Sequence, residues 1–309
     1  MENHVIEWGQ LVVFYLFLAG MSAGTFVTSV FAAYADPERY KNIVRMGSFI
    51  SPIPVSVGCA ILLLDLGRPF HFYNLYRTVQ WTSPMSIGSW LLAIFIVISS
   101  IRAYTFFPEQ WKIVKLPFEA RIRGATGLVG LPIALGVGIY TGILLGAIPA
   151  RPFWNTPLLA ELFLFSALST GVATLLLICS LNPMRSPEST KSHEHKFLLS
   201  FDIVLITIEI FIIIPIILHS QLSALSIRES IFVILGGPYT VVFWVGTVLC
   251  GLLVPLAIEL FEMSPNFMKK AQTHWNPVLG VTSSVLIIIG GFLLRYVVTY
   301  GGQLSGMIE

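Results

Sequence analysis

Long apolar segments alternate with short polar ones along the whole chain. Eight apolar segments are long enough to cross about 30 Å of hydrocarbon as helices of about 20 residues. The short connections are polar and rich in helix breakers, such as Ser83-Pro84 and Asn182-Pro183. The pattern predicts an all-α integral membrane protein with eight transmembrane helices, forming one transmembrane domain over residues 1–309 with two successive four-helix groups at about 9–147 and 158–300. The predicted spans are 9–34, 47–66, 85–107, 125–147, 158–181, 198–219, 239–262 and 277–300.

Composition agrees with a chain that sits mostly in lipid. Of the 309 residues, 55% are hydrophobic and 11% are charged, against about 25% charged in an average soluble domain. A soluble core does not account for these values, and no connection is long enough to form a second domain. We therefore expect the lipid membrane as a partner, and no nucleic acid.

Basic residues are concentrated in alternate connections. The second, fourth and sixth connections hold only Arg68, Arg77, Arg151 and Arg228, whereas twelve of the 18 Lys and Arg lie in the odd-numbered ones. Since cytoplasmic loops carry the excess of Lys and Arg, we expect both termini on the outer, periplasmic side of a prokaryotic inner (cytoplasmic) membrane. The twelve are Arg39, Lys41, Arg45, Lys112, Lys115, Arg121, Arg123, Arg185, Lys191, Lys196, Lys269 and Lys270.

Few residues of this chain are suited to hold a redox cofactor. A haem between helices most often needs two histidines at matching depth, and of the six histidines only His219 lies near the end of a membrane helix. Cys59, Cys179 and Cys250 lack the spacing of a metal or iron–sulfur site, and there is no Gly-rich turn for a dinucleotide. We expect no haem, no iron–sulfur cluster and no flavin here, so a redox role would use a diffusible cofactor from the membrane.

Several polar residues share one depth near the outer side of the predicted bundle. A quinone site needs donors to its two carbonyls, a proton-exchanging partner, and apolar walls for the ring and tail. The residues at this level supply that mixture, so it is a candidate quinone site. They are Tyr15, Asp65, Arg68, His71, Tyr140 and Arg295, with Trp154 and Glu161 close by.

The segment Leu64-Asp65-Leu66-Gly67-Arg68-Pro69 has an alternative interpretation. Gly67 suits the C-terminal cap of a helix, and Pro69 would stop it. Asp65 and Arg68 would then be a pair three residues apart at a helix end. Capping and function are compatible with each other.

Acidic residues also occur inside the predicted membrane region. Asp202 and Glu209 lie seven residues apart, two turns along one face of the sixth span. Such a pair can relay protons from the inner side toward the outer site, or can serve as protonated carboxyls that hydrogen-bond neighbouring helices. Glu259, Glu262 and Arg102 lie nearer to the ends of their spans, where we expect them to reach the interface and anchor it.

Five segments, taken in order, resemble the NrfD/PsrC family of membrane subunits. Any one of them is weak, but the ordered set is specific. The resemblance implies an eight-helix membrane subunit that interacts with a quinone. The segments are residues 15–24, YLFLAGMSAG; 65–69, DLGRP; 83–90, SPMSIGSW; 140–142, YTG; and 151–157, RPFWNTP.

The resemblance also implies residue roles. The quinol, menaquinol or ubiquinol, would bind near the outer face around Tyr15, Asp65 and Tyr140. Members are thought to use acidic residues of the sixth helix and an arginine of the last helix. Here these are Asp202 and Glu209 as a proton relay, and Arg295.

The family further implies partners. Members pass electrons to a ferredoxin-like subunit with several [4Fe-4S] clusters, which commonly serves a molybdopterin catalytic subunit. We expect this subunit to dock on the outer loops 67–84 and 148–157, whose Arg77, Trp81, Arg151 and Trp154 are types enriched at interfaces.

Together these expectations describe quinol oxidation, or quinone reduction with the same residues. Asp65, helped by His71, would take the protons, while Tyr15 and Tyr140 position the ring oxygens. Arg68 or Arg295 would stabilise developing negative charge. Two other classes remain as alternatives: a passive membrane anchor of such a complex, and a secondary transporter, for which the chain shows no internal repeat.

Overall fold

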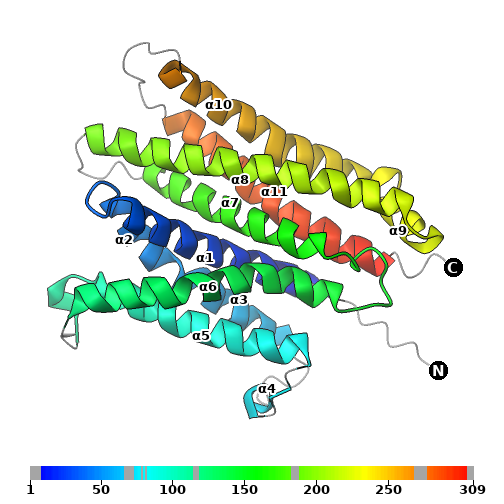
Figure 1. Ribbon diagram of the computed structural model, residues 1–309, viewed down its shortest axis with the longest axis horizontal. Helices are drawn as coiled ribbons and strands as arrows, with labels where there is room; N and C mark the ends of the chain where they lie inside the picture. Colours follow the sequence, from blue (N-terminus) through cyan, green and yellow to red (C-terminus); the bar gives the residue numbers. More distant parts are fainter. Residues whose placement is uncertain are drawn as a thin grey trace.

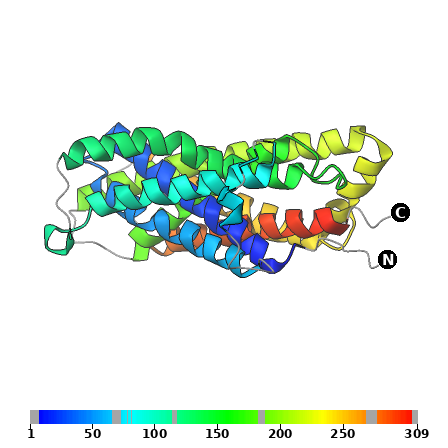
Figure 2. The ribbon, with the colours of Figure 1, turned by 90° about the horizontal axis from the view of Figure 1, so that it is seen from below.

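The structure is a computed structural model that describes residues 8–65, 73–77, 79–80, 82–113, 118–181, 188–267 and 277–304. Within these ranges every regular element is helical, and the helices run roughly along one long axis (Figures 1 and 2). In chain order they are α1 (Gln10–Ala35), α2 (Lys41–Ile50), α3 (Pro52–Asp65), α4 (Asn74–Arg77), α5 (Pro84–Thr105), η2 (Glu109–Trp111), α6 (Glu119–Gly146), α7 (Leu158–Leu181), α8 (Glu188–Leu222), α9 (Leu225–Leu235), η3 (Val242–Leu253), α10 (Val254–Phe267) and α11 (Pro277–Leu304).

All eight predicted spans are confirmed as helices long and apolar enough to cross a membrane. Four of them are longer than predicted: the second begins at Lys41, α6 at Glu119 and α8 at Glu188, and α11 ends at Leu304. The 35 residues of α8 correspond to about 52 Å at 1.5 Å per residue, well beyond the hydrocarbon thickness. Helix α8 therefore extends outside the membrane.

The second and seventh spans depart from a regular α-helix. The second is divided into α2 and α3 at Ser51, because Pro52 has no backbone N–H to continue the hydrogen-bond ladder. The Ser22 hydroxyl of α1 donates to the Ser51 carbonyl at this junction. The seventh span begins as the π-helix η3 and continues as α10; π-helical segments are rare and frequent at functional sites.

Helices α1 and α7 form the centre of the bundle. Their apolar segments are 78% and 72% buried, against 33–44% for the other six spans. They cross at Gly24 and Gly171, where a Cβ on either glycine would collide with the backbone of the other helix. The spacing of Gly20 and Gly24 is the small-residue pattern that lets transmembrane helices approach closely.

Both ends of the described chain meet at one end of the bundle. The Gln303 amide donates to the Trp8 carbonyl at 3.1 Å and accepts from the Trp8 amide at 3.0 Å. This end, defined by Trp8 and Gln303, is called the terminal end below. The opposite end, defined by Arg102 and Arg123, is called the basic end. The terminal end is the predicted outer side, and that orientation stays a prediction.

Candidate functional site

Tyr15 of α1 and Tyr140 of α6 face each other near the terminal end. Their side chains are buried, with 1% and 7% exposed, and their hydroxyls lie next to each other. Among the described residues, no hydrogen bond of good geometry engages the Tyr15 hydroxyl. A buried, unsatisfied hydroxyl costs free energy unless a partner completes it, so this pair is suited to a polar ligand.

The wall around the tyrosine pair comes from three further helices. Gly88 of α5 lies directly under the Tyr140 ring, and any Cβ there would overlap it. Cys59 of α3 and Tyr76 of α4 interact electrostatically with Tyr15. Because Gly88 has no side chain, the phenol ring of Tyr140 can occupy the space beside it. From the sequence, Cys59 is considered only as a possible metal or iron–sulfur ligand, and not as a neighbour of the tyrosines.

The described structure reaches only part of the predicted acidic segment. Helix α3 ends at Asp65, six residues beyond Cys59, which is about 9 Å along the helix axis. The backbone of Asp65 therefore lies toward the terminal end from the tyrosine pair, and its role in the site stays a prediction. The side chain of Asp65, together with Arg68, His71 and Trp81, lies outside the described residues.

Trp154 has a structural role in the loop between α6 and α7. Its indole N–H donates to the Val298 carbonyl at 2.7 Å, and its ring packs on Trp8. Only 1% of its surface is exposed, so the expectation that Trp154 offers a docking surface to a partner is wrong. Its donor is already engaged, which leaves only the ring for contact with a ligand. Arg151 fixes the same loop by donating to the Gln303 carbonyl.

Arg295 of α11 lies deeper than the tyrosine pair and is fully buried. It sits against Gly20, five residues further along α1 than Tyr15, or about 7.5 Å. Its guanidinium donates to the Ser166 hydroxyl at 3.2 Å and to the Gly291 carbonyl at 2.8 Å. Gly24 lets α1 and α7 pack closely, whereas Gly20 leaves space for the buried guanidinium of Arg295.

Glu209 of α8 is the acidic partner of Arg295. The two side chains lie close enough to interact electrostatically, and the Ser166 hydroxyl that accepts from Arg295 lies beside the Glu209 carboxyl. Two turns along α8, Asp202 accepts a 2.7 Å hydrogen bond from Ser169. The predicted placement of Asp202 and Glu209 on one buried face is confirmed. Two serines of α7, three residues apart, therefore lie beside the two carboxyls.

Glu259 of α10 extends this row toward the basic end. It faces Asp202 and Glu262, its side chain is fully buried, and neither oxygen has a hydrogen-bond partner in the described part of the chain. Glu262 in turn approaches His195 at 3.4 Å. The expectation that Glu259 anchors the interface is wrong, because neighbouring helices cover it. We call the row Arg295, Glu209, Asp202, Glu259 and Glu262 the buried acidic chain.

Arg102 was expected at the interface and is also buried, with 2% exposed. Its Nε donates to the Ser48 hydroxyl at 3.1 Å, and Nη1 donates to the Arg123 carbonyl at 2.8 Å. The interface expectation fails here because α2 and α6 close over the end of α5. Arg102 belongs to the basic end and is separate from the tyrosine pair.

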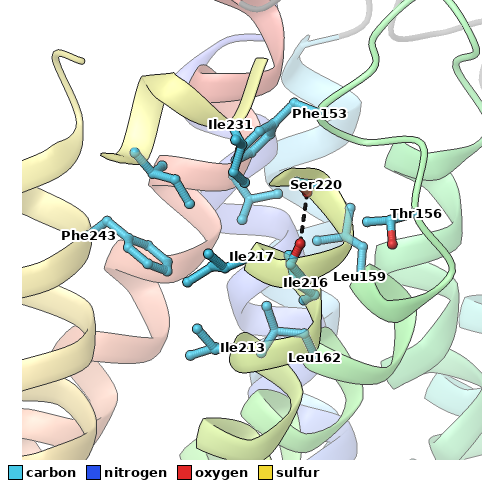
Figure 3. Close-up of a pocket in the computed structure, with 12 residues that line it drawn as sticks. Phe153, Thr156, Leu159, Leu162, Ile213, Ile216, Ile217, Ser220, Ile231 and Phe243 are labelled. Atoms are coloured by element: carbon cyan, nitrogen blue, oxygen red, sulfur yellow. Dashed lines mark hydrogen bonds between the residues drawn. The ribbon is translucent and has the colours of Figure 1, made fainter. Parts of the chain in front are cut away.

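A narrow apolar crevice lies one turn beyond the Arg295–Glu209 pair, on the side of the terminal end (Figure 3). Ile213 follows Glu209 by four residues and Val298 follows Arg295 by three, so both line it. Its volume of about 30 Å³ has room for about one water molecule. A quinone ring would enter only if side chains moved. Other lining residues include Phe153, Leu159, Leu162, Ile217, Ile231 and Phe243.

The fold is that of a multi-pass membrane protein: among the described residues it has eight helices able to span a membrane, and they bury a row of ionisable groups. Ionisable groups inside a membrane usually mark a functional site. Within this class, the chain belongs to the NrfD family: the family described as "Polysulphide reductase, NrfD" matches residues 1–306. The resemblance seen in the sequence is confirmed. The described residues contain no group of three or more His, Cys, Asp or Glu that could hold a metal ion.

Named relatives include subunits of several reductases. The sequence is 28% identical to the protein NrfD homolog of Haemophilus influenzae, covering 97% of this chain and 95% of that protein. It is 28% identical to a chain of the polysulfide reductase of Wolinella succinogenes, covering 98% and 96%. A subunit of the selenate reductase of Mesobacillus selenatarsenatis is 24% identical over 84% of this chain and 67% of that protein. The similarity is thus to membrane subunits of reductase complexes.

Proposed function

We propose that this chain is the quinone-handling membrane subunit of a respiratory oxidoreductase complex in a prokaryotic inner membrane. Quinol, with menaquinol the expected form, binds near the terminal end, gives two electrons to a ferredoxin-like [4Fe-4S] subunit, releases two protons and leaves as quinone. That subunit serves a molybdopterin catalytic subunit, where the terminal substrate reacts. Quinone reduction uses the same residues in reverse.

The observation that carries this proposal is the facing pair of buried hydroxyls, Tyr15 and Tyr140. Two neutral donors at one site suit the carbonyl and hydroxyl oxygens of a quinone or quinol, which carry no charge of their own. The Tyr15 hydroxyl is left for a ligand to complete. Asp65 at the end of α3, with His71, would accept the protons that the quinol loses.

Electrons and protons would take different routes. Electrons leave at the terminal end, where loops 67–84 and 148–157 would receive the iron–sulfur subunit. Arg77 is exposed in the first of these loops. The second is held rigid by Trp154 and Arg151, so it offers a preformed surface to a partner. A preformed surface loses less conformational entropy on binding than a flexible one.

The buried acidic chain would serve as a proton relay between the basic end and the site near the terminal end. Glu209 and Asp202 are two turns apart on α8, about 10 Å, which is too far for direct transfer and requires an intervening water. Ser166 and Ser169 lie beside the two carboxyls and can orient such a water. Glu259 and Glu262 continue the row from Asp202.

The test is quinol-driven reduction of the partner's clusters in membranes that carry Tyr140→Phe or Asp65→Asn, with assembly checked by co-purification. We expect roughly a hundredfold slower reduction in an assembled complex, since a positioned proton-transfer or hydrogen-bonding group typically contributes that much or more. Tyr296→Phe is the matched control, because it also removes one phenol hydroxyl from the terminal half. Unchanged reduction in both test variants would favour a passive anchor and contradict the proposal.

A further inference from the structure

A cavity of about 500 Å³ opens at the basic end, bounded by α1, α2, α5, α6 and the segment between α1 and α2. It is distant from the tyrosine pair, which lies near the terminal end. Its lining combines two kinds of side chain. Lys41, Arg102 and Arg123 are cationic, while Val30, Ala33 and Phe106 form an apolar wall.

Arg102 is the buried cation of this cavity. Its guanidinium lies over the rings of Phe26 and Phe106. Its hydrogen bonds go to a serine hydroxyl and a backbone carbonyl. No carboxylate of the described chain lies within salt-bridge distance of it. A buried charge without a counter-ion is costly, so the site favours an anion.

The carboxylate nearest to Arg123 does not supply the negative charge that would neutralise Arg102. Glu119 pairs with Arg123 at 3.4 Å and also with Lys112, so two cations share it. Among the cavity's own lining residues, three are cations and Glu38 is the carboxylate. The cavity therefore keeps a net positive charge that an external anion can neutralise.

Two glycines of α6 keep the cavity open. A Cβ on Gly127 would lie 2.9 Å from Arg102 Nη1, so the missing side chain lets the guanidinium reach the cavity. A Cβ on Gly124 would meet nothing within 4 Å. The space beside the cations is thus wide, and its other side is apolar. A free phosphate would use the cations but would leave the apolar wall uncovered.

We propose that this cavity binds an anionic phospholipid, with its phosphodiester on Arg102 and Arg123 and its acyl chains along Val30, Ala33 and Phe106. Basic pockets between transmembrane helices on the cytoplasmic side are suited to such headgroups, and the cations and the end of the apolar wall meet where the spans α1 and α5 end. The lipid phosphate supplies the counter-ion that the protein lacks. Charged guanidinium donors form charge-assisted hydrogen bonds with phosphate oxygens.

The experiment uses the full-length protein, purified in detergent and stripped of lipid. Phosphatidylglycerol, phosphatidylcholine with the same acyl chains, and inorganic phosphate are added separately, and binding is measured by native mass spectrometry and by the shift in unfolding temperature. We expect phosphatidylglycerol to bind roughly tenfold more tightly than phosphatidylcholine, and Arg102→Gln to remove that preference. Arg45→Gln is the control: Arg45 is an exposed cation of α2 that lies over Phe49 and does not line the cavity.

A second variant protects the test against misfolding of Arg102→Gln. Gly124→Leu adds a side chain whose Cβ meets nothing within 4 Å and replaces glycine by a better helix former, so the lipid-free variant should unfold no earlier than the unmodified protein. Phosphatidylglycerol binding should nevertheless fall roughly tenfold, because the acyl chains lose their space. The proposal is overturned if Gly124→Leu binds as before, if Arg45→Gln loses binding equally, or if inorganic phosphate competes as well as the lipid.

Discussion

The tyrosine pair and the buried acidic chain are both polar sites inside the membrane, but they depend on their surroundings in different ways. Tyr15 and Tyr140 are neutral, and their position comes from packing against Gly88. Arg295 and Glu209 are ionisable, buried and close enough to interact electrostatically, and Arg295 also donates to Ser166. A hydroxyl can be removed from the first site without leaving a charge behind. Removing either Arg295 or Glu209 leaves the other buried without a compensating charge. A substitution in the tyrosine pair can therefore lower activity without lowering stability, whereas a substitution at Arg295 or Glu209 should lower both.

The largest effect is expected at Arg295. Arg295→Gln should destabilise the protein by about 3–5 kcal/mol, since it removes the cation that interacts with the buried Glu209 carboxyl and leaves that carboxyl uncompensated, and the complex should not be recovered. Glu209→Gln combined with Arg295→Gln should restore part of that loss, with a coupling of about 0.5–3 kcal/mol in a double-mutant cycle. Unfolding of the purified protein in detergent gives each value. Strictly additive losses would show that the two groups do not act as a pair.

A smaller and more specific loss is expected at the tyrosine pair. Gly88→Ala should displace the Tyr140 ring and slow quinol-driven cluster reduction roughly a hundredfold, as removal of the hydroxyl does. Gly136→Ala on α6 is the control, because its Cβ would meet only the Leu91 side chain at 3.4 Å, an ordinary contact. Both variants are compared at equal complex recovery. A normal rate in Gly88→Ala would mean that the position of Tyr140 is unimportant for the reaction.

The buried acidic chain predicts a separation of proton from electron transfer. Asp202→Asn keeps the shape of the side chain next to Ser169 but cannot release a proton, so proton uptake from the basic end during quinone reduction should fall roughly tenfold. Cluster reduction in uncoupled membranes should change by less than about threefold, since the quinone stays at the terminal end. Glu161→Gln, at an exposed acid of α7, is the control. A pH-sensitive dye in oriented vesicles measures uptake, and unchanged uptake argues against a relay.

The smallest effect is expected at Cys59. Although it lies beside Tyr15 and Tyr140, a thiol is a weak donor and packs as a small apolar side chain. Cys59→Ala should therefore change the rate by less than about twofold and the stability by less than about 1 kcal/mol. The same reduction assay and an unfolding curve check this. A larger drop in rate at normal stability would add Cys59 to the site.

The helices and the tyrosine pair could be predicted from the sequence for simple physical reasons. Apolar length alone defines a membrane span, so all eight were found. Counting residues from the span ends then set the depths of Tyr15 and Tyr140. Asp202 and Glu209 are seven residues apart, so helical periodicity put them on one face.

The remaining features depend on contacts between spans, which depth alone does not give. Glu259 and Arg102 lie near span ends, where charged side chains usually reach water, yet neighbouring helices cover both. Arg295 was expected at the depth of the tyrosines, but it lies deeper, beside Gly20, and the side of α11 that it occupies leads it to Ser166 and Glu209. The one sequence feature that pointed to these contacts was Gly20, because the absence of a side chain there leaves space for the guanidinium of Arg295.

The π-helix η3 sets the angular position of the residues that follow it in the seventh span. Because its hydrogen bonds run from i to i+5, each turn holds more residues than an α-turn, and the helix after it is rotated about its own axis. Glu259 follows the end of η3 by six residues and meets Asp202 only at the rotation that η3 imposes. Inserting or deleting a single residue between Val242 and Leu253 would turn Glu259 toward lipid while leaving every side chain type in place. The number of residues in this segment therefore determines the direction in which the Glu259 side chain points.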